Sequence, residues 1–313
     1  MHTRPIGTLN ASVVGLGCNN FGRRLDLAGT KSVLDAAIDA GVTFLDTADL
    51  YGGTDSERFM GEALRGRRDA VLIATKFGHP ANSQAPTGAR PEDVRRALEA
   101  SLRRLATDHI DLYQLHMPDA DVPIADTLGA LAEAVERGEV LEIGCSNFDA
   151  AQLQEADEAA QQGGPRFVSV QNEYSMLKRA PESAVLPACE RLDIAFLPYF
   201  PLLSGILTGK YRKGRALPQG TRVTGSERWE AMLTDEVLDL VEELVAFAAV
   251  RDRELIDLAF AYLLAHRPVA SVIAGATSPA QVRRNAMAGT WELGTDELQV
   301  VERILDAAGV LLA

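Results

Sequence analysis

The chain has 313 residues, of which 47% are hydrophobic and 24% are charged, and its formal net charge is −13. This length and composition suit a globular protein with one large α/β domain or two ordinary ones. The acidic charge makes nucleic acid and anionic membrane surfaces unfavourable partners.

Neither targeting nor crosslinking signals stand out in the sequence. The first residues, MHTRPIGTLNAS, lack the apolar core of a signal peptide, and no run approaches the roughly 18 apolar residues of a membrane span. Three widely spaced cysteines without a C-x-x-C motif argue against a disulfide framework and a structural zinc site. We therefore expect a cytoplasmic protein with reduced thiols and no bound metal.

Short apolar runs alternate with helical patterns along the chain. Eight runs have the length and composition of β-strands, at 13–17, 43–48, 70–76, 110–116, 142–147, 167–173, 194–200 and 271–276. Helical patterns with start or stop signals lie at 30–41, 90–105, 126–138 and 278–289. Such alternation predicts parallel strands joined by crossover helices.

Eight strand-helix units favour a closed (β/α)8 TIM barrel that occupies residues 1–313 as a single domain. An open doubly wound sheet is the alternative, but no G-x-G-x-x-G motif opens the first unit. Residues 4–17 resemble two short strands around an Asn-containing turn, a β-hairpin expected to close the barrel floor. The connection after the seventh strand, residues 201–250, is unusually long, and long loops at this end of a barrel commonly cover a ligand.

Polar residues stand at or just beyond the C-terminal ends of five consecutive predicted strands, the end of a barrel that carries the active site. They are Asp46, Lys76, His116, Ser146 with Asn147, and Gln171. A lysine beside a carboxylate can favour ionisation of a nearby tyrosine, whose pKa is normally about 10. Such a tyrosine can protonate a carbonyl oxygen that a histidine polarises. None of these groups is a reductant, so a cofactor must supply the hydride.

Seven sequence segments together resemble one known family. They are FLDTADLYGGTDSERFMGEAL, VLIATKFG, DHIDLYQLHMPD, IGCSNF, VQNEYS, LPYFPLLSGILTGKY and IAGATSPAQVRRN, in this order over essentially the whole chain. This ordered set resembles the aldo-keto reductase superfamily, in particular its bacterial branch related to the potassium-channel β subunits. The resemblance implies a (β/α)8 barrel, a nicotinamide cofactor bound across its mouth, and reversible reduction of aldehyde or ketone carbonyls to alcohols.

The resemblance also assigns roles to four side chains. Tyr51 matches the general acid, Lys76 the group that lowers its pKa, Asp46 the carboxylate that holds Lys76, and His116 the group that orients the carbonyl. Four other polar residues are expected to support loops and not to enter the chemistry: His109, Asp49, Asp111 and Asp119.

Cofactor contacts follow from the same resemblance. Ser146, Asn147 and Gln171 match the residues that bind the nicotinamide carboxamide, and Tyr199 matches the aromatic residue that stacks on its ring. The segment after Tyr199 matches the pyrophosphate region, through Phe200, Pro201, Leu202, Ser204, Gly205, Leu207 and Lys210. The last strand and helix contribute Gly275, Thr277, Gln281 and Asn285.

The choice between NADP and NAD depends on that last strand and helix. Better-known members hold the adenosine 2′-phosphate with lysine, serine and arginine, and the matching residues here are Gly275, Ala276 and Gln281. The bacterial branch instead uses the Thr and Gln of this motif with a nearby arginine, for which Arg283 and Arg284 are present. A third arginine, Arg222 on the long connection, is a candidate to close over the phosphates. We expect NADP, with NAD as the alternative.

The substrate is expected to be a small molecule with a carbonyl or alcohol group. Candidate pocket walls are Asn20, Phe21, Phe77, Met117 and Trp229. Two other functions stay open: a cofactor-binding regulatory subunit on the same scaffold, and a barrel enzyme that uses Lys76 as a Schiff base. The sequence predicts no particular oligomeric state.

Overall fold

Eight parallel strands close into a barrel in the computed structural model, which describes residues 1–82, 88–161 and 166–309. Neighbouring strands follow the chain order, and the last strand pairs with the first in parallel. The strands are β3 (Val14–Gly17), β4 (Phe44–Asp46), β5 (Leu72–Phe77), β6 (Ile110–Leu115), β7 (Val140–Ser146), β8 (Ser169–Glu173), β9 (Ala195–Tyr199) and β10 (Val272–Gly275). The predicted (β/α)8 barrel is confirmed.

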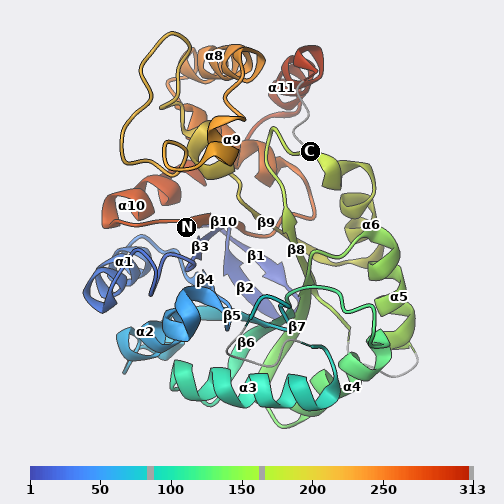
Figure 1. Cartoon of the computed structure of the whole chain (residues 1–313). Coiled ribbons are helices and arrows are strands. Elements are labelled where there is room, and N and C mark those ends of the chain that lie inside the picture. The colour runs from blue at the N-terminus through green and yellow to red at the C-terminus, as the bar shows by residue number, and fades with distance from the viewer. Residues whose placement is uncertain (83–87, 162–165, 310–313) are drawn as a thin grey trace.

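Helices surround these strands on the outside of the barrel (Figure 1). The helices that alternate with the strands are α1 (Leu27–Asp39), α2 (Asp55–Ala63), α3 (Pro91–Leu105), α4 (Ile124–Glu136), α5 (Ala150–Gln161), α6 (Val185–Leu192), α9 (Leu255–Ala265) and α10 (Pro279–Ala288). Three more are α7 (Glu227–Glu230), α8 (Asp235–Ala249) and α11 (Thr295–Ala308). Helix α1 begins earlier than predicted because the Asp26 side chain accepts a hydrogen bond from the Gly29 backbone N–H and caps it.

An N-terminal hairpin closes the floor of the barrel. Its strands, β1 (Thr3–Ile6) and β2 (Leu9–Ser12), are antiparallel, and Ile6 and Leu9 pack with side chains that fill the barrel interior. The turn was expected around Asn10, but Asn10 lies within β2 and the turn is Gly7–Thr8. Gly7 has a φ of 57°, which a glycine adopts without strain at the first position of a two-residue turn.

The connection between β9 and α9 is long, as predicted, but it is not all loop. It contains a short 3-10 segment (Leu203–Thr208), α7 and the full-length helix α8. The Thr234 side chain caps α8 by accepting a hydrogen bond from the Val237 N–H. Helix α8 packs against α9 and α11, so the second half of this connection forms an outer layer of helices.

The chain carries no feature that would suggest a membrane span or a disulfide in its described part. Within residues 1–82, 88–161 and 166–309, no helix is both long and apolar enough to cross a bilayer. Cys18, Cys145 and Cys189 are buried and free. Across the same described ranges, no group of three or more His, Cys, Asp or Glu side chains could hold a metal ion.

Candidate active site

A buried ion pair stands at the C-terminal end of the barrel. Lys76 Nζ lies 2.7 Å from Asp46 Oδ1 and also donates to the Thr47 carbonyl oxygen at 2.8 Å. The side-chain amides of Gln171 and Gln114 donate to the same Asp46 oxygen at 2.8 and 3.4 Å. These contacts compensate for the desolvation that a buried ion pair suffers. Gln114 was not predicted, although it lies two positions after the barrel-facing Leu112 on β6 and therefore points to the same inner face.

Tyr51 lies beside this ion pair, at the start of a 3-10 turn after β4. Lys76 Nζ is 5.4 Å from the centre of its ring, and the His116 ring meets it edge to face at 6.2 Å. Burial raises the pKa of Tyr51, and the Asp46 carboxylate raises it further. Burial therefore sets the direction of the shift, and the expected effect of Lys76 on the pKa of Tyr51 stays a prediction.

His116 follows β6 and is nearly buried at the barrel mouth. Burial lowers its pKa to about 2, and the charges of Lys76 and His79 act in the same direction. The imidazole is therefore neutral near pH 7. Among the residues the structure describes, His116 Nδ1 has no hydrogen-bond partner.

His79 is a residue of this site that the sequence analysis missed. Its ring centre lies 4.7 Å from that of His116. The signal was its position in the loop after β5, three residues beyond Lys76 and at the same end of the barrel. Burial lowers the pKa of His79, so both imidazoles favour the neutral form.

Four of the predicted cofactor residues form one hydrogen-bonded group at the mouth. Ser146 Oγ donates to the Gln171 carbonyl oxygen at 2.7 Å, and the Asn147 amide donates to Ser146 Oγ at 3.1 Å. The same amide donates to the His116 carbonyl oxygen at 2.9 Å. Tyr199 donates its hydroxyl to Asn147 Oδ1 at 2.9 Å. The strand-end residues of β6, β7, β8 and β9 are thereby linked.

The segment after Tyr199 has the features of a phosphate cradle. Phe200, Ser204 and Gly205 have positive φ angles, of 53°, 55° and 100°, so the backbone bends sharply, and the N–H groups of Leu203 and Gly205 donate to carbonyl oxygens within the bend. Ser204 Oγ is buried and has no hydrogen-bond partner in the described part of the chain. Lys210 Nζ would lie 2.9 Å from a Cβ on Gly205, so the lysine reaches this bend. This donor set fits the pyrophosphate of a dinucleotide.

The other members of this segment differ in their exposure. Leu202 is half-buried, whereas Pro201 is buried and Leu207 is fully buried. Leu207 belongs to the hydrophobic core that holds the segment against the barrel.

The last strand and helix meet at a capped helix N-terminus. Ser278 caps α10 by accepting a hydrogen bond from the Gln281 N–H. The Gln281 side-chain oxygen accepts hydrogen bonds from the Thr277 backbone N–H at 2.7 Å and from its hydroxyl at 3.0 Å. Gly275 is exposed at the end of β10, and Asn285 is buried on α10.

The two arginines of α10 differ in their contacts. Arg284 is bound by Glu254 at 2.9 Å and by Asp257 at 2.7 Å. Arg283 lines a groove of about 530 Å³ together with the N-terminal residues Met1 and His2. Arg284 is therefore held by two acids, whereas Arg283 is exposed, and the expected role of either arginine at a 2′-phosphate stays a prediction.

The predicted pocket walls divide into two groups. Phe21 and Phe77 are fully buried, and Phe77 stacks on Tyr113 with ring centres 4.6 Å apart. Both phenylalanines are in the hydrophobic core and not on the surface of the mouth. Asn20 is nearly buried, and Met117 and Trp229 are half-buried.

The four residues expected to lie outside the chemistry occupy supporting positions. His109 hydrogen-bonds its neighbour Asp108 at the N-terminal end of β6. Asp111 binds Arg68, and Asp119 accepts a hydrogen bond from the Ala89 N–H. The fourth, Asp49, is fully buried between Asp46 and Tyr51, and its backbone N–H donates to the Lys76 carbonyl oxygen at 3.1 Å.

Comparison with known proteins adds to this geometry. The sequence model of the aldo/keto reductase family matches residues 13–306. A probable voltage-gated potassium channel subunit beta from Arabidopsis thaliana is 34% identical over 279 residues, which cover 86% of this chain and 84% of that protein. An aldo-keto reductase from Schizosaccharomyces pombe, named yakc and NADP(+), is 32% identical over 275 residues, covering 84% of this chain and 79% of the other.

Comparison with a solved structure indicates the same family. Aldo-keto reductase AKR11C1 from Bacillus halodurans, in its holo form, is 31% identical and superposes with a TM-score of 0.78, covering 97% of this chain and 96% of that one. The match extends over nearly the whole of both chains, including the barrel and the long connection. The chain therefore belongs to the aldo/keto reductase family and is an NAD(P)-dependent oxidoreductase of that type.

Proposed function

We propose that this protein reduces aldehyde or ketone carbonyls to alcohols, reversibly, with NADP as its cofactor. The observation that carries the proposal is that Tyr51 lies beside His116 and the buried Lys76–Asp46 ion pair at the barrel mouth. A bound nicotinamide supplies the hydride in one direction and accepts it in the other.

Tyr51 is the proposed general acid. Such a group must hold its proton until charge develops on the substrate oxygen. The raised pKa of Tyr51 meets this requirement, because burial and Asp46 favour the neutral phenol. The Lys76 ammonium, 5.4 Å from the ring centre, then stabilises the phenolate that remains after proton transfer.

His116 is the proposed orienting group. A neutral imidazole carries one N–H donor, which can bind the carbonyl oxygen without giving up its proton. Such a fixed donor stabilises the negative charge that develops as hydride arrives. The lowered pKa of His116 supports this role, since it favours the uncharged ring.

The NADP assignment has two supports. The Schizosaccharomyces pombe relative carries NADP(+) in its name. The Thr277–Gln281 pair borders the N-terminus of α10, where backbone N–H groups and the helix dipole favour an anion. We also propose a cytoplasmic location, which the three buried free cysteines support because such thiols persist in reducing compartments.

The reaction and the cofactor are tested together with purified protein. We expect NADPH absorbance to fall only when an aromatic aldehyde or a dicarbonyl is added. Fluorescence titration should give tighter binding of NADPH than of NADH. Comparable affinities would contradict the NADP assignment, and an absence of carbonyl-dependent NADPH oxidation would contradict the reductase assignment.

A regulatory subunit is the second candidate, and the 34% identity to the Arabidopsis relative favours it. That function predicts tight NADPH binding without repeated turnover on any carbonyl in a broad panel. Schiff-base chemistry at Lys76 has less support, because it would break the contacts of Lys76 Nζ with Asp46 and the Thr47 carbonyl oxygen and would leave Tyr51 and His116 without a role. Borohydride trapping of a substrate adduct on Lys76 would contradict this argument.

A further inference from the structure

The imidazole of His116 is not fixed by a hydrogen bond to any residue in the described part of the chain. Its Nδ1 atom is buried and has no partner there. The backbone of His116 is held, because its N–H donates to the Phe77 carbonyl oxygen at 2.8 Å and its carbonyl oxygen accepts from the Asn147 amide at 2.9 Å. The main chain is therefore anchored on two sides, whereas the ring depends on the side chains that pack against it.

Two other histidines show the usual way in which an imidazole is held. His109 Nδ1 lies 2.8 Å from a carboxylate oxygen of Asp108, and His266 Nδ1 lies 3.0 Å from the Tyr262 carbonyl oxygen. A partner at one ring nitrogen fixes the tautomer and the rotation of an imidazole, and so directs the other nitrogen. His116 needs another support if its N–H is to meet a substrate oxygen.

Two rings contact His116 edge to face. The Tyr51 ring centre is 6.2 Å away with the ring planes at 84°, and the His79 ring centre is 4.7 Å away with the planes at 70°. Such a contact sets the positive edge of one ring against the negative face of the other, and it favours one mutual orientation. Burial lowers the pKa of both histidines, so the closer contact joins two neutral rings and not two like charges. His79 is therefore the nearer support of the His116 ring.

His79 is itself fixed by the loop that carries it. Gly78 follows β5 directly and has a φ of 80°, so the chain turns as soon as the strand ends. The Asn82 backbone N–H donates to the His79 carbonyl oxygen at 2.9 Å, and the Ala81 backbone N–H donates to His79 Nδ1 at 3.0 Å. Because a backbone N–H can only donate, Nδ1 is unprotonated and the neutral ring carries its proton on Nε2. This turn sets both the orientation and the tautomer of His79.

Strand pairing brings the two histidines together. Phe77 at the end of β5 pairs with Leu115 at the end of β6, and the hydrogen bond from the His116 N–H to Phe77 continues this pairing by one residue. A Cβ on Gly78 would lie 3.0 Å from Leu115 Cδ1, so the loop of His79 passes close to the end of β6. The contact between the imidazoles is thus built on the paired strand ends.

We propose that His79 is a positioning residue, which holds the His116 imidazole in the orientation that donates its N–H to the substrate carbonyl oxygen. The inference rests on the proposed function and deepens it, because it adds a residue that acts through His116. A donor aimed at developing negative charge stabilises the transition state more than the bound substrate, so a misdirected imidazole lowers kcat. The proposed NADPH contacts lie on other strands, so cofactor affinity should not depend on His79.

The test replaces His79 in three ways and follows the reduction of an aromatic aldehyde by NADPH. His79→Ala removes the ring, His79→Gln keeps a hydrogen-bonding side chain without a ring, and His79→Phe keeps a ring without a hydrogen-bonding group. We expect kcat to fall about 10- to 100-fold in the Ala and Gln variants, with KM and NADPH affinity close to those of the parent. The Phe variant should recover most of the lost kcat. Parent-like kcat in His79→Ala, or recovery by Gln in place of Phe, would overturn the proposal.

A double-mutant cycle shows whether His79 acts through His116. In a His116→Gln background the imidazole to be positioned is gone, so adding His79→Ala should change the residual kcat little. An equal loss of kcat in both backgrounds would overturn the proposal, because His79 would then act independently of His116.

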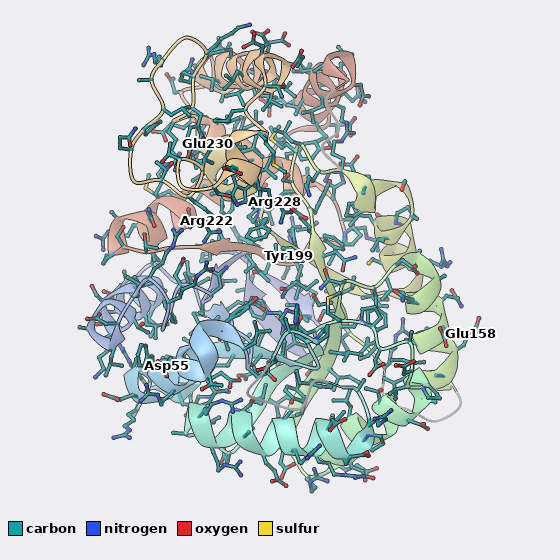
Figure 2. All side chains as sticks on the ribbon, in the orientation of Figure 1. Asp55, Glu158, Tyr199, Arg222, Arg228 and Glu230 are labelled. Atoms are coloured by element: carbon teal, nitrogen blue, oxygen red, sulfur yellow. The ribbon has the colours of Figure 1, made fainter. Side chains whose placement is uncertain are left out.

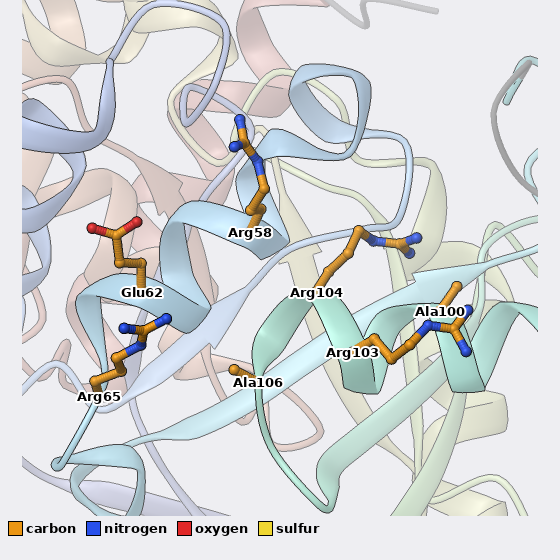
Figure 3. Close-up of a pocket in the computed structure, with 7 residues that line it drawn as sticks. All are labelled: Arg58, Glu62, Arg65, Ala100, Arg103, Arg104 and Ala106. Atoms are coloured by element: carbon orange, nitrogen blue, oxygen red, sulfur yellow. The ribbon is translucent and has the colours of Figure 1, made fainter.

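Two control variants should keep the kcat of the parent. His109→Ala removes an imidazole at the opposite end of the barrel, and Arg65→Gln changes an exposed side chain in the groove between α2 and α3 that Figure 3 shows. NADPH titration reports whether each variant is folded, and if His79→Ala does not fold, the comparison of the Phe and Gln variants decides. A parent protein without carbonyl-dependent NADPH oxidation would overturn the proposed function. An active parent with an equally active His79→Ala variant would overturn only the positioning role.

Discussion

Asp49 is the residue whose ionisation the fold opposes most clearly near neutral pH. Its carboxyl is fully buried two residues before Tyr51. Burial raises its pKa to about 7, and the Glu57 carboxylate adds to the rise, while Arg104 and hydrogen bonds partly oppose it. An ionised Asp49 would place an unfavourable buried charge next to the loop that carries Tyr51.

This predicts a specific pH dependence of stability. Because the folded pKa of Asp49 lies above the unfolded value, its protonation stabilises the fold fully below about pH 4, and this contribution is lost as the pH rises through about 7. Each unit of difference is worth about 1.4 kcal/mol, so the loss is of the order of 2–4 kcal/mol. Asp49→Asn should therefore flatten the decrease in unfolding free energy between pH 4 and 8, measured by urea denaturation.

The control for Asp49 is an exposed acid on another helix. Asp126→Asn, in the first turn of α4, should leave the shape of the pH profile as in the parent. If Asp49→Asn and Asp126→Asn give the same pH profile, Asp49 is ionised in the folded protein and the argument from burial fails.

At the residue scale, the positions of the strand ends predicted which polar side chains meet at the barrel mouth. They did not predict how the neighbouring residues pack or how the pKa of Tyr51 shifts. Asp46, Lys76 and His116 could be predicted because parallel strands in a barrel end at one mouth. Phe77 follows Lys76, and adjacent side chains on a strand point to opposite faces, so it packs outside the barrel against Tyr113. The pKa of Tyr51 depends on burial and on the charge balance around it, which strand position does not reveal.

A hydrogen-bonded acid joins three elements on the outer side of the barrel. Glu182 accepts hydrogen bonds from Tyr174 and Tyr262 at 2.7 and 2.6 Å, so the loop after β8 is tied to α9. Arg179 binds Glu182 at 2.9 Å and Asp306 of α11 at 2.7 Å. Burial alone would raise the pKa of Glu182, but hydrogen bonds from Arg179 and the two tyrosines lower it overall.

Glu182→Gln should destabilise the fold by about 1–3 kcal/mol at pH 7, because it removes the charge that Arg179 binds. Because the folded pKa of Glu182 lies below the unfolded value, the ionised carboxylate stabilises the fold above the unfolded pKa. This contribution is lost as the pH falls through the folded pKa. The deficit measured by urea denaturation should therefore stay constant from pH 7 to about 4.5, the ordinary pKa, and shrink below it. Glu158→Gln, at the exposed α5 residue labelled in Figure 2, is the control. An equal effect of both substitutions would contradict the role of Glu182.

At the element scale, the predicted strands lie within a few residues of the observed ones, because both faces of each strand are covered and apolar. The predicted element boundaries are wrong where a single residue sets the local backbone conformation. Asn10 looked like a turn residue, but Gly7 provides the positive φ that the hairpin needs. The length of the connection at 201–250 was predicted, and Thr234 caps a full helix, α8, in its second half.

At the scale of the whole molecule, the barrel assembles the site from residues far apart in the sequence. Asp46 on β4 accepts a hydrogen bond from Gln171 on β8, 125 positions later. Asn20 and Arg222, 202 positions apart, meet across the mouth. The order of the strands could be predicted from the alternation of elements, but the contact between Asn20 and Arg222 could not, because no sequence pattern places the long connection against the loop after β3.

Measuring Tyr51→Phe tests the central claim most directly. The substitution removes only the phenolic hydroxyl, so NADPH should bind with parent-like affinity in a fluorescence titration. Reduction of an aromatic aldehyde should fall by about 10²- to 10⁴-fold, because the proton donor is lost. If Tyr51→Phe reduced the aldehyde as fast as the parent, Tyr51 would not be the general acid, and the proposed mechanism would be contradicted.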